Sequence, residues 1–306
     1  GAITDSGNIS VDGSSKTATF AAGGSNNITL DQSGNDFKTL VITSGNNVSV
    51  VDTDDIALGA STVSGTFTVT ASSITNAGDL AITGAATFTI ANGQSITLDS
   101  SGNNFSSSVT FAASSGTIAD ITIVENSALE FGGLTITGDL TATVSGGAVT
   151  QSGALVVPGT TTVTASGQNV TFNNASNNFG TIGITGANVT IVDTNAMVLG
   201  GSSVSGTYSV TSTAGSITNS GNLDIEGAST YTVTNGQSIN LNSSGNDFTG
   251  TVTFTASSGT IADITIVDNS AFDVKGLTIT GDLSVTAVGA ITDSGNISVD
   301  GSSKTA

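Results

Sequence analysis

Residues 66–70 read Thr-Phe-Thr-Val-Thr, and residues 251–255 read Thr-Val-Thr-Phe-Thr. Apolar and hydroxyl side chains alternate in both segments, and a period of two places the apolar residues on one face of a β-strand. Comparable runs of four to six residues occur along the whole chain, separated by Gly, Asn, Asp and Ser, which favour turns. We therefore expect short strands whose Thr side faces water and whose Val, Ile and Phe side lines an interior.

Three sequence phrases recur around these strands. The first, I/V-T-x-S/A-G, begins at Ile3, Ile74, Val149, Ile217 and Ile291. The second, I/V-T/N-L/F followed by S-(G)-N-D/N-F, begins at Ile28, Ile96, Val170 and Ile239. The third, V/I-x-V/I-V-D/E, begins at Val48, Ile121, Val189 and Ile264. Twelve phrase starts in 288 residues give a mean spacing of about 24 residues, which is enough for three short strands and three turns.

This spacing predicts an all-β fold, a parallel β-helix or β-solenoid with three short strands per coil. It predicts about 24 residues per coil and about 12 coils in 288 residues, or about 58 Å of stacked strands. The alternative is a string of β-sandwich domains. Sandwich modules of about 100 residues fit a 72-residue unit poorly, and the core Trp common in sandwiches is absent.

The domain organisation follows from a longer repeat. Residues 1–18 and residues 289–306 are identical, GAITDSGNISVDGSSKTA. We expect residues 1–288 to form one full repeat of a continuous solenoid, and residues 289–306 to start the next one. The recurring phrases divide that repeat into four sub-repeats at about residues 1–71, 72–146, 147–214 and 215–288.

The composition excludes several classes of function. The chain has 23 acidic residues against four basic ones, with a net charge of −19, so nothing in it neutralises the phosphates of a nucleic acid. No apolar run has transmembrane length, so we expect no membrane insertion. There is no Cys for a disulfide and no His. Catalysis has little chemical basis without His, Cys or Arg, so we do not expect an enzyme.

The second phrase carries the candidate structural residues. Its Phe recurs as Phe37, Phe105, Phe179 and Phe248, and its Asn recurs as Asn35, Asn103, Asn177 and Asn246. Because aromatic residues are few, we expect the Phe side chains in the core rather than in a carbohydrate-binding strip. We expect the Asn side chains to stack or to cap turns through hydrogen bonds to the backbone.

The third phrase carries the candidate metal ligands. Its final acid extends in the first sub-repeat to Asp52-Thr53-Asp54-Asp55. The carboxylates of Asp52, Asp54 and Asp55 could bind Ca²⁺ through hard oxygen ligands, although the EF-hand and nonapeptide spacings are absent. The alternative is a solvated turn without any cofactor. Thr-rich runs such as residues 160–164 are similar to ice-binding arrays, but the variable spacing predicts that Thr positions drift from coil to coil.

The phrases GAITDSGNISV, ITLDSSGNNF and LTITGDLTATVSGGAVTQSG resemble the tandem repeats of very large bacterial secreted exoproteins, of the filamentous-haemagglutinin and autotransporter type. The resemblance implies a right-handed parallel β-helix at the cell surface, with roles in adhesion, aggregation or biofilm matrix. The identical 288-residue repeat departs from typical passengers of that type and favours a structural filament built from copies of itself, joined end to end, with lateral bundling of such filaments as a further option. The alternatives are an adhesin that binds glycans or a receptor, and a Ca²⁺-stiffened surface rod.

Overall fold

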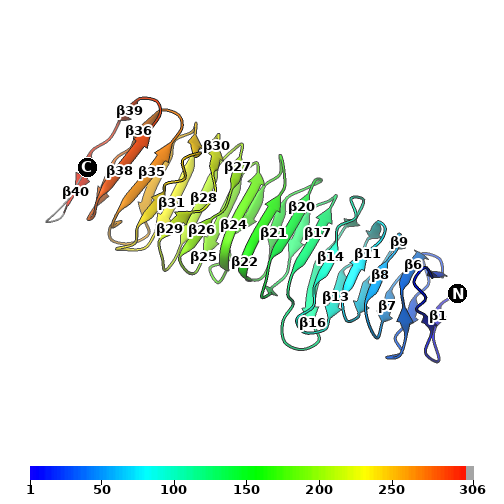
Figure 1. Ribbon diagram of the computed structural model, residues 1–306. Coiled ribbons are helices and arrows are strands. Elements are labelled where there is room, and N and C mark those ends of the chain that lie inside the picture. Colours follow the sequence, from blue (N-terminus) through cyan, green and yellow to red (C-terminus); the bar gives the residue numbers. More distant parts are fainter. Residues whose placement is uncertain (301–306) are drawn as a thin grey trace. The chain divides into compact units, whose positions relative to one another are not determined.

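The computed structural model describes residues 1–300, and every paired strand in it is parallel (Figure 1). The chain divides into two compact units, residues 1–153 and residues from 154 onward. Each unit is a β-solenoid, and together they comprise about 14 turns of about 21 residues. Residues 1–300 contain no helix long and apolar enough to cross a membrane. The fold class expected from the alternating pattern is confirmed.

Unit 1 is built from three parallel sheets. The first sheet contains β1 (Ile3–Thr4), β4 (Ile28–Leu30), β7 (Val48–Val51), β10 (Phe67–Thr70), β13 (Ala86–Ile90), β16 (Val109–Ala113), β18 (Leu129–Phe131) and β21 (Val149–Gln151). The second contains β3 (Ala18–Ala21), β6 (Thr39–Ser44), β8 (Ile56–Leu58), β11 (Ile74–Asn76), β14 (Ile96–Leu98), β17 (Ile121–Glu125) and β20 (Leu140–Val144). The third contains β9 (Ser61–Val63), β12 (Leu80–Ile82) and β15 (Asn104–Phe105). Three short strands complete the unit, β2 (Ser10–Val11), β5 (Asp36–Phe37) and β19 (Leu134–Thr135).

Unit 2 repeats this arrangement. Its first sheet contains β23 (Val170–Phe172), β25 (Val189–Asp193), β28 (Tyr208–Ser212), β31 (Ser229–Val233) and β34 (Val252–Ala256). Its second contains β22 (Leu155–Thr164), β24 (Asn178–Gly186), β26 (Met197–Leu199), β29 (Ile217–Asn219), β32 (Ile239–Leu241), β35 (Ile264–Asp268) and β38 (Leu283–Ala287). Its third contains β27 (Ser202–Val204), β30 (Leu223–Ile225) and β33 (Asp247–Phe248). Two pairs follow, β36 (Phe272–Val274) with β39 (Ile291–Asp293), and β37 (Leu277–Ile279) with β40 (Ile297–Val299).

One turn consists of three strands, as the sequence predicts. Strands β7, β8 and β9 form one turn, and β10, β11 and β12 form the next. Phe67 pairs with Val48, and both side chains are buried. Thr68 lies next to Phe67 on β10, and its side chain is half-buried on the outer face. The alternation of Thr with apolar residues therefore separates the two faces as expected.

The predicted coil length of about 24 residues and coil number of about 12 are wrong, since the turns number about 14 and contain about 21 residues each. The phrases do not mark successive turns, so their spacing is not the length of one turn. The second phrase begins on β4 of the first sheet at Ile28, but on β14 of the second sheet at Ile96. A sub-repeat of about 72 residues therefore spans about three and a half turns, because the same alternating strand fits either sheet.

The interior is filled with aliphatic and aromatic side chains. In unit 1, the ring of Phe88 lies edge-on to those of Phe67 and Phe105, with centroids 6.0 and 5.9 Å away. In unit 2, Tyr231 takes the equivalent place, with its ring 6.0 Å from that of Tyr208. This contiguous core supplies the apolar burial that holds each stack of short strands together.

Candidate functional site

The acid that ends the third phrase is buried. Val48, Val50 and Asp52 are alternate residues, all three point inward, and Asp52 is only 5% exposed. The backbone N–H of Phe37 donates to Asp52 Oδ2 at 2.7 Å, and the N–H of Asp54 donates to Asp52 Oδ1 at 3.1 Å. The alternative of a solvated turn is therefore wrong for this carboxylate. Its inward position was readable from the strand alternation, which continues one step into the acid.

The same pair recurs in every sub-repeat. Phe105, Phe179 and Phe248 donate their backbone N–H to the carboxylates of Glu125, Asp193 and Asp268, at 3.0, 2.7 and 3.1 Å respectively. Each of these carboxylates also accepts the N–H of the residue two positions further on. The acid therefore connects its turn of the solenoid to the preceding turn, and it also fixes the bend of the chain that directly follows its own strand.

Burial changes the ionisation of these acids. It raises the pKa of Asp52 to about 6, and it also raises the pKa values of Glu125 and Asp193. The backbone N–H donors act in the opposite direction, because they stabilise the ionised form. The carboxylate–amide pair is thus a charge-assisted bond inside a largely apolar interior.

The Asn residues of the second phrase are fully buried and bond to the preceding turn. Asn103 Oδ1 accepts the backbone N–H of Leu80 at 3.0 Å and the side-chain amide of Asn76 at 2.8 Å. Asn103 Nδ2 donates to the carbonyl oxygen of Leu98 at 3.0 Å. The other three occupy matching positions: Leu223 donates to Asn246, Ile9 to Asn35 and Leu155 to Asn177, each through its backbone N–H.

Together, these hydrogen bonds link the three phrases across three consecutive turns, and we call this network the three-turn clamp. In its first copy, Asn35 donates to Asp5 Oδ2 at 2.8 Å in the turn before, and Phe37 donates to Asp52 in the turn after. The second copy uses Asn76, Asn103, Phe105 and Glu125, and the fourth uses Asn219, Asn246, Phe248 and Asp268. The sequence shows the phrases but not that they bond to one another across consecutive turns.

All four Phe side chains of the second phrase lie inside the protein. Phe37 and Phe105 are at most 1% exposed, and Phe179 and Phe248 are 2 and 3% exposed. Phe37 contacts the ring of Phe20, with centroids 6.2 Å apart. These four residues therefore form no aromatic strip on the surface.

The proposed calcium ligands are not brought together. Asp52 points into the core, whereas Asp54 and Asp55 are exposed. Asp55 Oδ1 accepts a hydrogen bond from Ser73 Oγ at 2.8 Å. Within residues 1–300, no group of three or more His, Cys, Asp or Glu side chains could hold a metal ion.

Threonines form ladders on the outer face of the first sheet. Thr68 pairs with Thr87, and Thr87 pairs with Thr110. In unit 2, Thr230 pairs with Thr253, and Thr232 pairs with Thr255. The expected drift of Thr positions is wrong here, because loops of different length absorb the variable spacing and leave the strand register intact.

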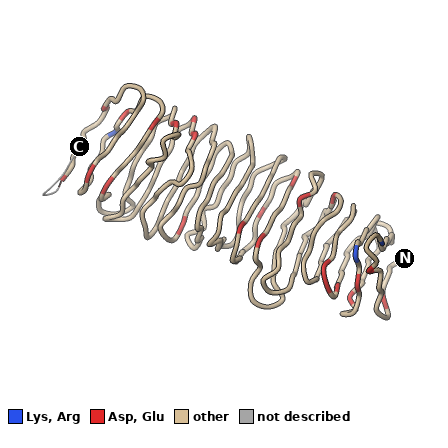
Figure 2. The backbone as a smooth tube through the Cα atoms, in the orientation of Figure 1, with Lys and Arg blue, Asp and Glu red and all other residues tan. Residues whose placement is uncertain are grey.

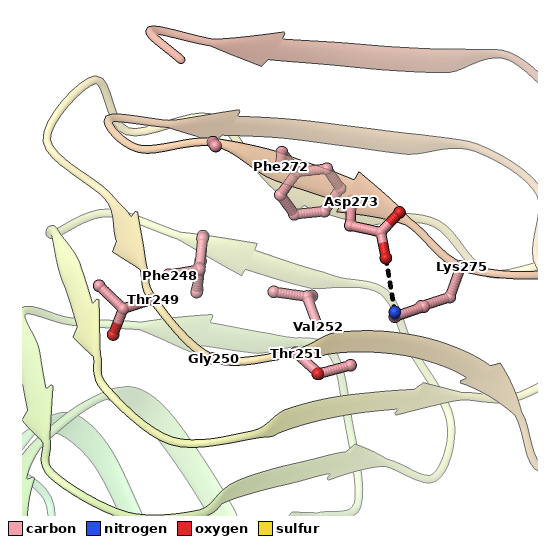
Figure 3. Close-up of a pocket in the computed structure, with 9 residues that line it drawn as sticks. Phe248, Thr249, Gly250, Thr251, Val252, Phe272, Asp273 and Lys275 are labelled. Atoms are coloured by element: carbon pink, nitrogen blue, oxygen red, sulfur yellow. Dashed lines mark hydrogen bonds and ion pairs between the residues drawn. The ribbon is translucent and has the colours of Figure 1, made fainter. Parts of the chain in front are cut away.

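A surface depression lies where the first sheet opens. In unit 2, β34 pairs with β31 but with no other described strand, and the cavity of about 180 Å³ beside it is lined by Phe248, Thr251, Phe272 and Asp273 (Figure 3). Lys275 reaches the carboxylate of Asp273 across its rim. An equivalent depression of about 490 Å³ in unit 1 is lined by Ser106, Ser107, Ser108 and Glu130, where β16 and β18 share a single pair. Both depressions combine hydroxyl groups with one carboxylate.

The surface charge is almost entirely negative. Acidic residues are distributed over both units, and only four residues in the sequence are basic (Figure 2). Such a surface repels other acidic surfaces at low ionic strength.

Comparison with known families gives one match. The model of the family DUF5649, described as repeats of unknown function, matches residues 1–44, 45–112, 118–185, 186–255 and 261–306. Comparisons with curated proteins and with solved structures found no match. The phrases that build the three-turn clamp lie within the matched segments, which cover most of the sequence. The chain belongs to the DUF5649 family of repeats.

Proposed function

We propose that this chain is a structural, non-enzymatic segment of a bacterial filament or fibre outside the cell. Its stacked turns would act as a spacer, hold cells together or form part of an extracellular matrix. The observation that carries this proposal is that the buried polar groups of the chain form hydrogen bonds between neighbouring turns. Asn103 and Glu125 are 0% exposed and bond neighbouring turns to each other, so they contribute to the continuity of the stack.

Two further observations support the proposal. The acidic surface favours solubility and limits lateral contact between copies. The resemblance of the phrases to secreted exoprotein repeats supports the location outside the cell. The identity of residues 1–18 with residues 289–306 supports copies of this chain as partners, arranged end to end.

Electron microscopy of the native assembly tests the structural role. With about 14 turns per 288 residues, stacked at about 4.8 Å, we expect a filament with an axial repeat of about 67 Å. This value replaces the 58 Å expected from 12 coils. An assembly of compact particles without this repeat would contradict the proposal.

An adhesin is the second candidate, favoured by the depression that both units repeat. Hydroxyl groups beside a carboxylate can bind the hydroxyl groups of a sugar through paired donors and acceptors. A glycan array distinguishes the two roles, because an adhesin should bind specific glycans and lose them after Glu130→Ala together with Asp273→Ala. A spacer should bind none of them.

A further inference from the structure

The depressions of the two units differ in the charge at their rims. Residues 271–277 of unit 2, AFDVKGL, correspond to residues 128–134 of unit 1, ALEFGGL, so Asp273 matches Glu130 and Lys275 matches Gly132. Lys275 Nζ donates to the carboxylate of Asp273 and to Ser294 Oγ, the second at 3.1 Å. The carboxylate in the unit 2 depression is therefore paired with a cation of its own chain (Figure 3).

Glu130 in unit 1 has no such cation. The chain contains no Lys, Arg or His from residue 39 to residue 274, so no neighbouring turn can supply one. Glu130 is exposed, and no described residue forms a hydrogen bond or ion pair with its carboxylate. A Cβ placed on Gly132 meets no atom within 4 Å, so the space that the Lys275 side chain enters in unit 2 is open here. The unit 1 depression is also the larger one, at about 490 Å³ against about 180 Å³.

The strand edge beside this depression is uncovered. β16 and β18 pair only at Val109 and Phe131, and the next pairing between these two turns joins Ile118 to Ile136. The chain takes more residues from Val109 to Ile118 than from Phe131 to Ile136, so residues 110–117 project beyond the following turn (Figure 1). After Val109, no described strand pairs with β16 on that side.

The backbone groups of this edge are directed towards the uncovered side. The N–H of Ser114 donates to the carbonyl oxygen of Ile90 in the preceding turn. Because backbone groups alternate in direction along a strand, the N–H and C=O groups of Phe111 and Ala113 point the other way, towards the uncovered side. An open edge of this kind is a template for an extended segment of another chain.

We propose that the unit 1 depression is a docking site for an extended segment of a partner protein, with a lysine of that segment paired to Glu130 and its backbone added to the edge of β16. A segment on this edge continues the line of β18 beyond Phe131, which is where Lys275 stands in the corresponding line of unit 2. The net charge of −19 favours a basic partner, and the hydroxyl groups of residues 106–108 offer further acceptors to the ammonium group. The inference goes beyond the structural role, and it gives this depression a peptide ligand in place of the glycan of the adhesin alternative.

A short peptide with a lysine at its start tests the site on the full chain. The probe is acetyl-Lys-Val-Thr-Val-Thr-amide, whose β-branched residues favour an extended backbone. The comparison peptide carries Nε-acetyl-lysine, which keeps the side-chain stem but lacks the charge. In an NMR titration of the isotope-labelled chain, the lysine peptide should shift the amide signals of Phe111, Ala113 and Glu130. The acetylated peptide should bind up to about fivefold more weakly, which is the size of one exposed ion pair.

Exchange of the rim residue between the units gives matched variants. Gly132→Lys places a cation beside Glu130 within the chain and should remove the binding. Lys275→Gly should create a second site in unit 2, because β34 also lacks a described strand on that side. Glu130→Gln should weaken binding of the lysine peptide to the level of the acetylated one. Asp99→Asn removes an exposed charge from the same unit outside the depression and should leave binding unchanged.

Equal weakening by Glu130→Gln and Asp99→Asn, or equal binding of the two peptides, would reduce the contact to general attraction by an acidic surface and overturn the site. Unchanged binding by a folded Gly132→Lys variant would also overturn it, and Glu130→Gln decides the question if that variant does not fold. Binding of a glycan that depends on Glu130, without binding of the lysine peptide, would assign the depression to the adhesin alternative. None of these results affects the axial repeat that tests the structural role.

Discussion

The backbone N–H of Phe37 donates to Asp52 Oδ2 at 2.7 Å, although the two residues lie on consecutive turns of unit 1. The apolar ring of Phe37 fills the core while its amide bonds the carboxylate, so one residue serves both packing and polar pairing. Such amide donors stabilise a buried carboxylate that has no cation beside it. If either the carboxylate or its amide donors are removed, the remaining buried group is left unpaired, which lowers the stability of the fold. Four such pairs in 288 residues make the third phrase a structural element.

Replacing Asp52 tests this pair. Asp52→Ala leaves the N–H groups of Phe37 and Asp54 without their acceptor, and we expect a loss of about 1–3 kcal/mol in unfolding free energy. Urea unfolding followed by circular dichroism measures the loss, and hydrogen exchange at the amide of Phe37 localises it. The matched control is Asp54→Ala, because that side chain is exposed and should change stability by less than about 0.5 kcal/mol. Equal effects of the two variants would contradict a special role for Asp52.

Stability should increase as the pH falls from 7.5 to 5. Burial raises the folded-state pKa of Asp52 to about 6, above the ordinary value of 3.8 that it has when unfolded. The folded protein therefore binds a proton more readily, and the stability contributed by protonation is lost as the pH rises through about 6. Glu125 and Asp193 act in the same direction. Hydrogen bonding lowers the pKa of Asp5, so its contribution is lost when the pH falls below about 4 and the trend should reverse there.

Thermal unfolding across this pH range measures the effect, with Asp52→Asn as the comparison. The variant cannot titrate at this position, so its stability should vary less between pH 5 and 7. A profile for Asp52→Asn identical to that of the unmodified chain would assign the pH dependence to the general decrease in surface charge.

The sequence was sufficient to predict the strands and their faces but not the length of a turn. Alternation at Thr66–Thr70 separates the two faces because it reflects local geometry. The phrase spacing did not predict the number of residues in one turn, because Ile28 and Ile96 begin equivalent phrases on different sheets. Strands of such similar composition fit either sheet, so only the long-range pairing determines where a turn closes.

The clamp was partly predictable. Asn103 was expected to bond the backbone of a turn, and the structure places it there with Leu80 and Leu98 as partners. The inward direction of Asp52 follows from the alternation of Val48 and Val50, but a carboxylate at a core position is uncommon, and the sequence interpretation offered a calcium ligand or a solvated turn instead. Its bond to Phe37 depends on the register between two turns, which the local sequence does not encode.

Asn103→Ala should destabilise unit 1 by about 2 kcal/mol, because it removes the acceptor of the Leu80 N–H and the donor to the Leu98 carbonyl oxygen. Asn103→Asp should be worse at pH 7 than at pH 4, since an ionised carboxylate at this fully buried position would face that carbonyl oxygen. Denaturant unfolding at the two pH values measures both effects. Asn104→Ala is the control, because Asn104 is exposed and bonds only the hydroxyl of Ser106 among described partners. A similar loss in Asn104→Ala would mean that the clamp is not the cause.

Removal of divalent cations should leave the unfolding temperature unchanged. The Asp52 carboxylate already accepts two N–H groups, and Asp54 and Asp55 are exposed beside it. Differential scanning calorimetry with and without a chelator makes the measurement. A drop of several degrees that added Ca²⁺ reverses would restore the calcium-stiffened alternative and place ligands outside the arrangement described for residues 1–300.

Unit 2 should gain stability when two of its core residues are replaced by their unit 1 counterparts. Tyr231 and Ser229 occupy the positions of Phe88 and Ala86, and in unit 2 the hydroxyl oxygens of these two side chains are buried without a described hydrogen-bond partner outside this pair. Tyr231→Phe with Ser229→Ala removes both oxygens and keeps the edge-on packing against Tyr208, so we expect a gain of about 1–2 kcal/mol in unfolding free energy.

The reverse exchange in unit 1, Phe88→Tyr with Ala86→Ser, serves as the matched control and should lower stability by a similar amount. Both pairs share a ring separation of 6.0 Å to the preceding turn, so the comparison isolates the buried oxygens from the packing. Denaturant unfolding of the two double variants checks the signs. If Tyr231→Phe with Ser229→Ala lost stability, the hydroxyl groups of unit 2 would have to be satisfied by internal water, because an unpaired polar group in an apolar core cannot stabilise it.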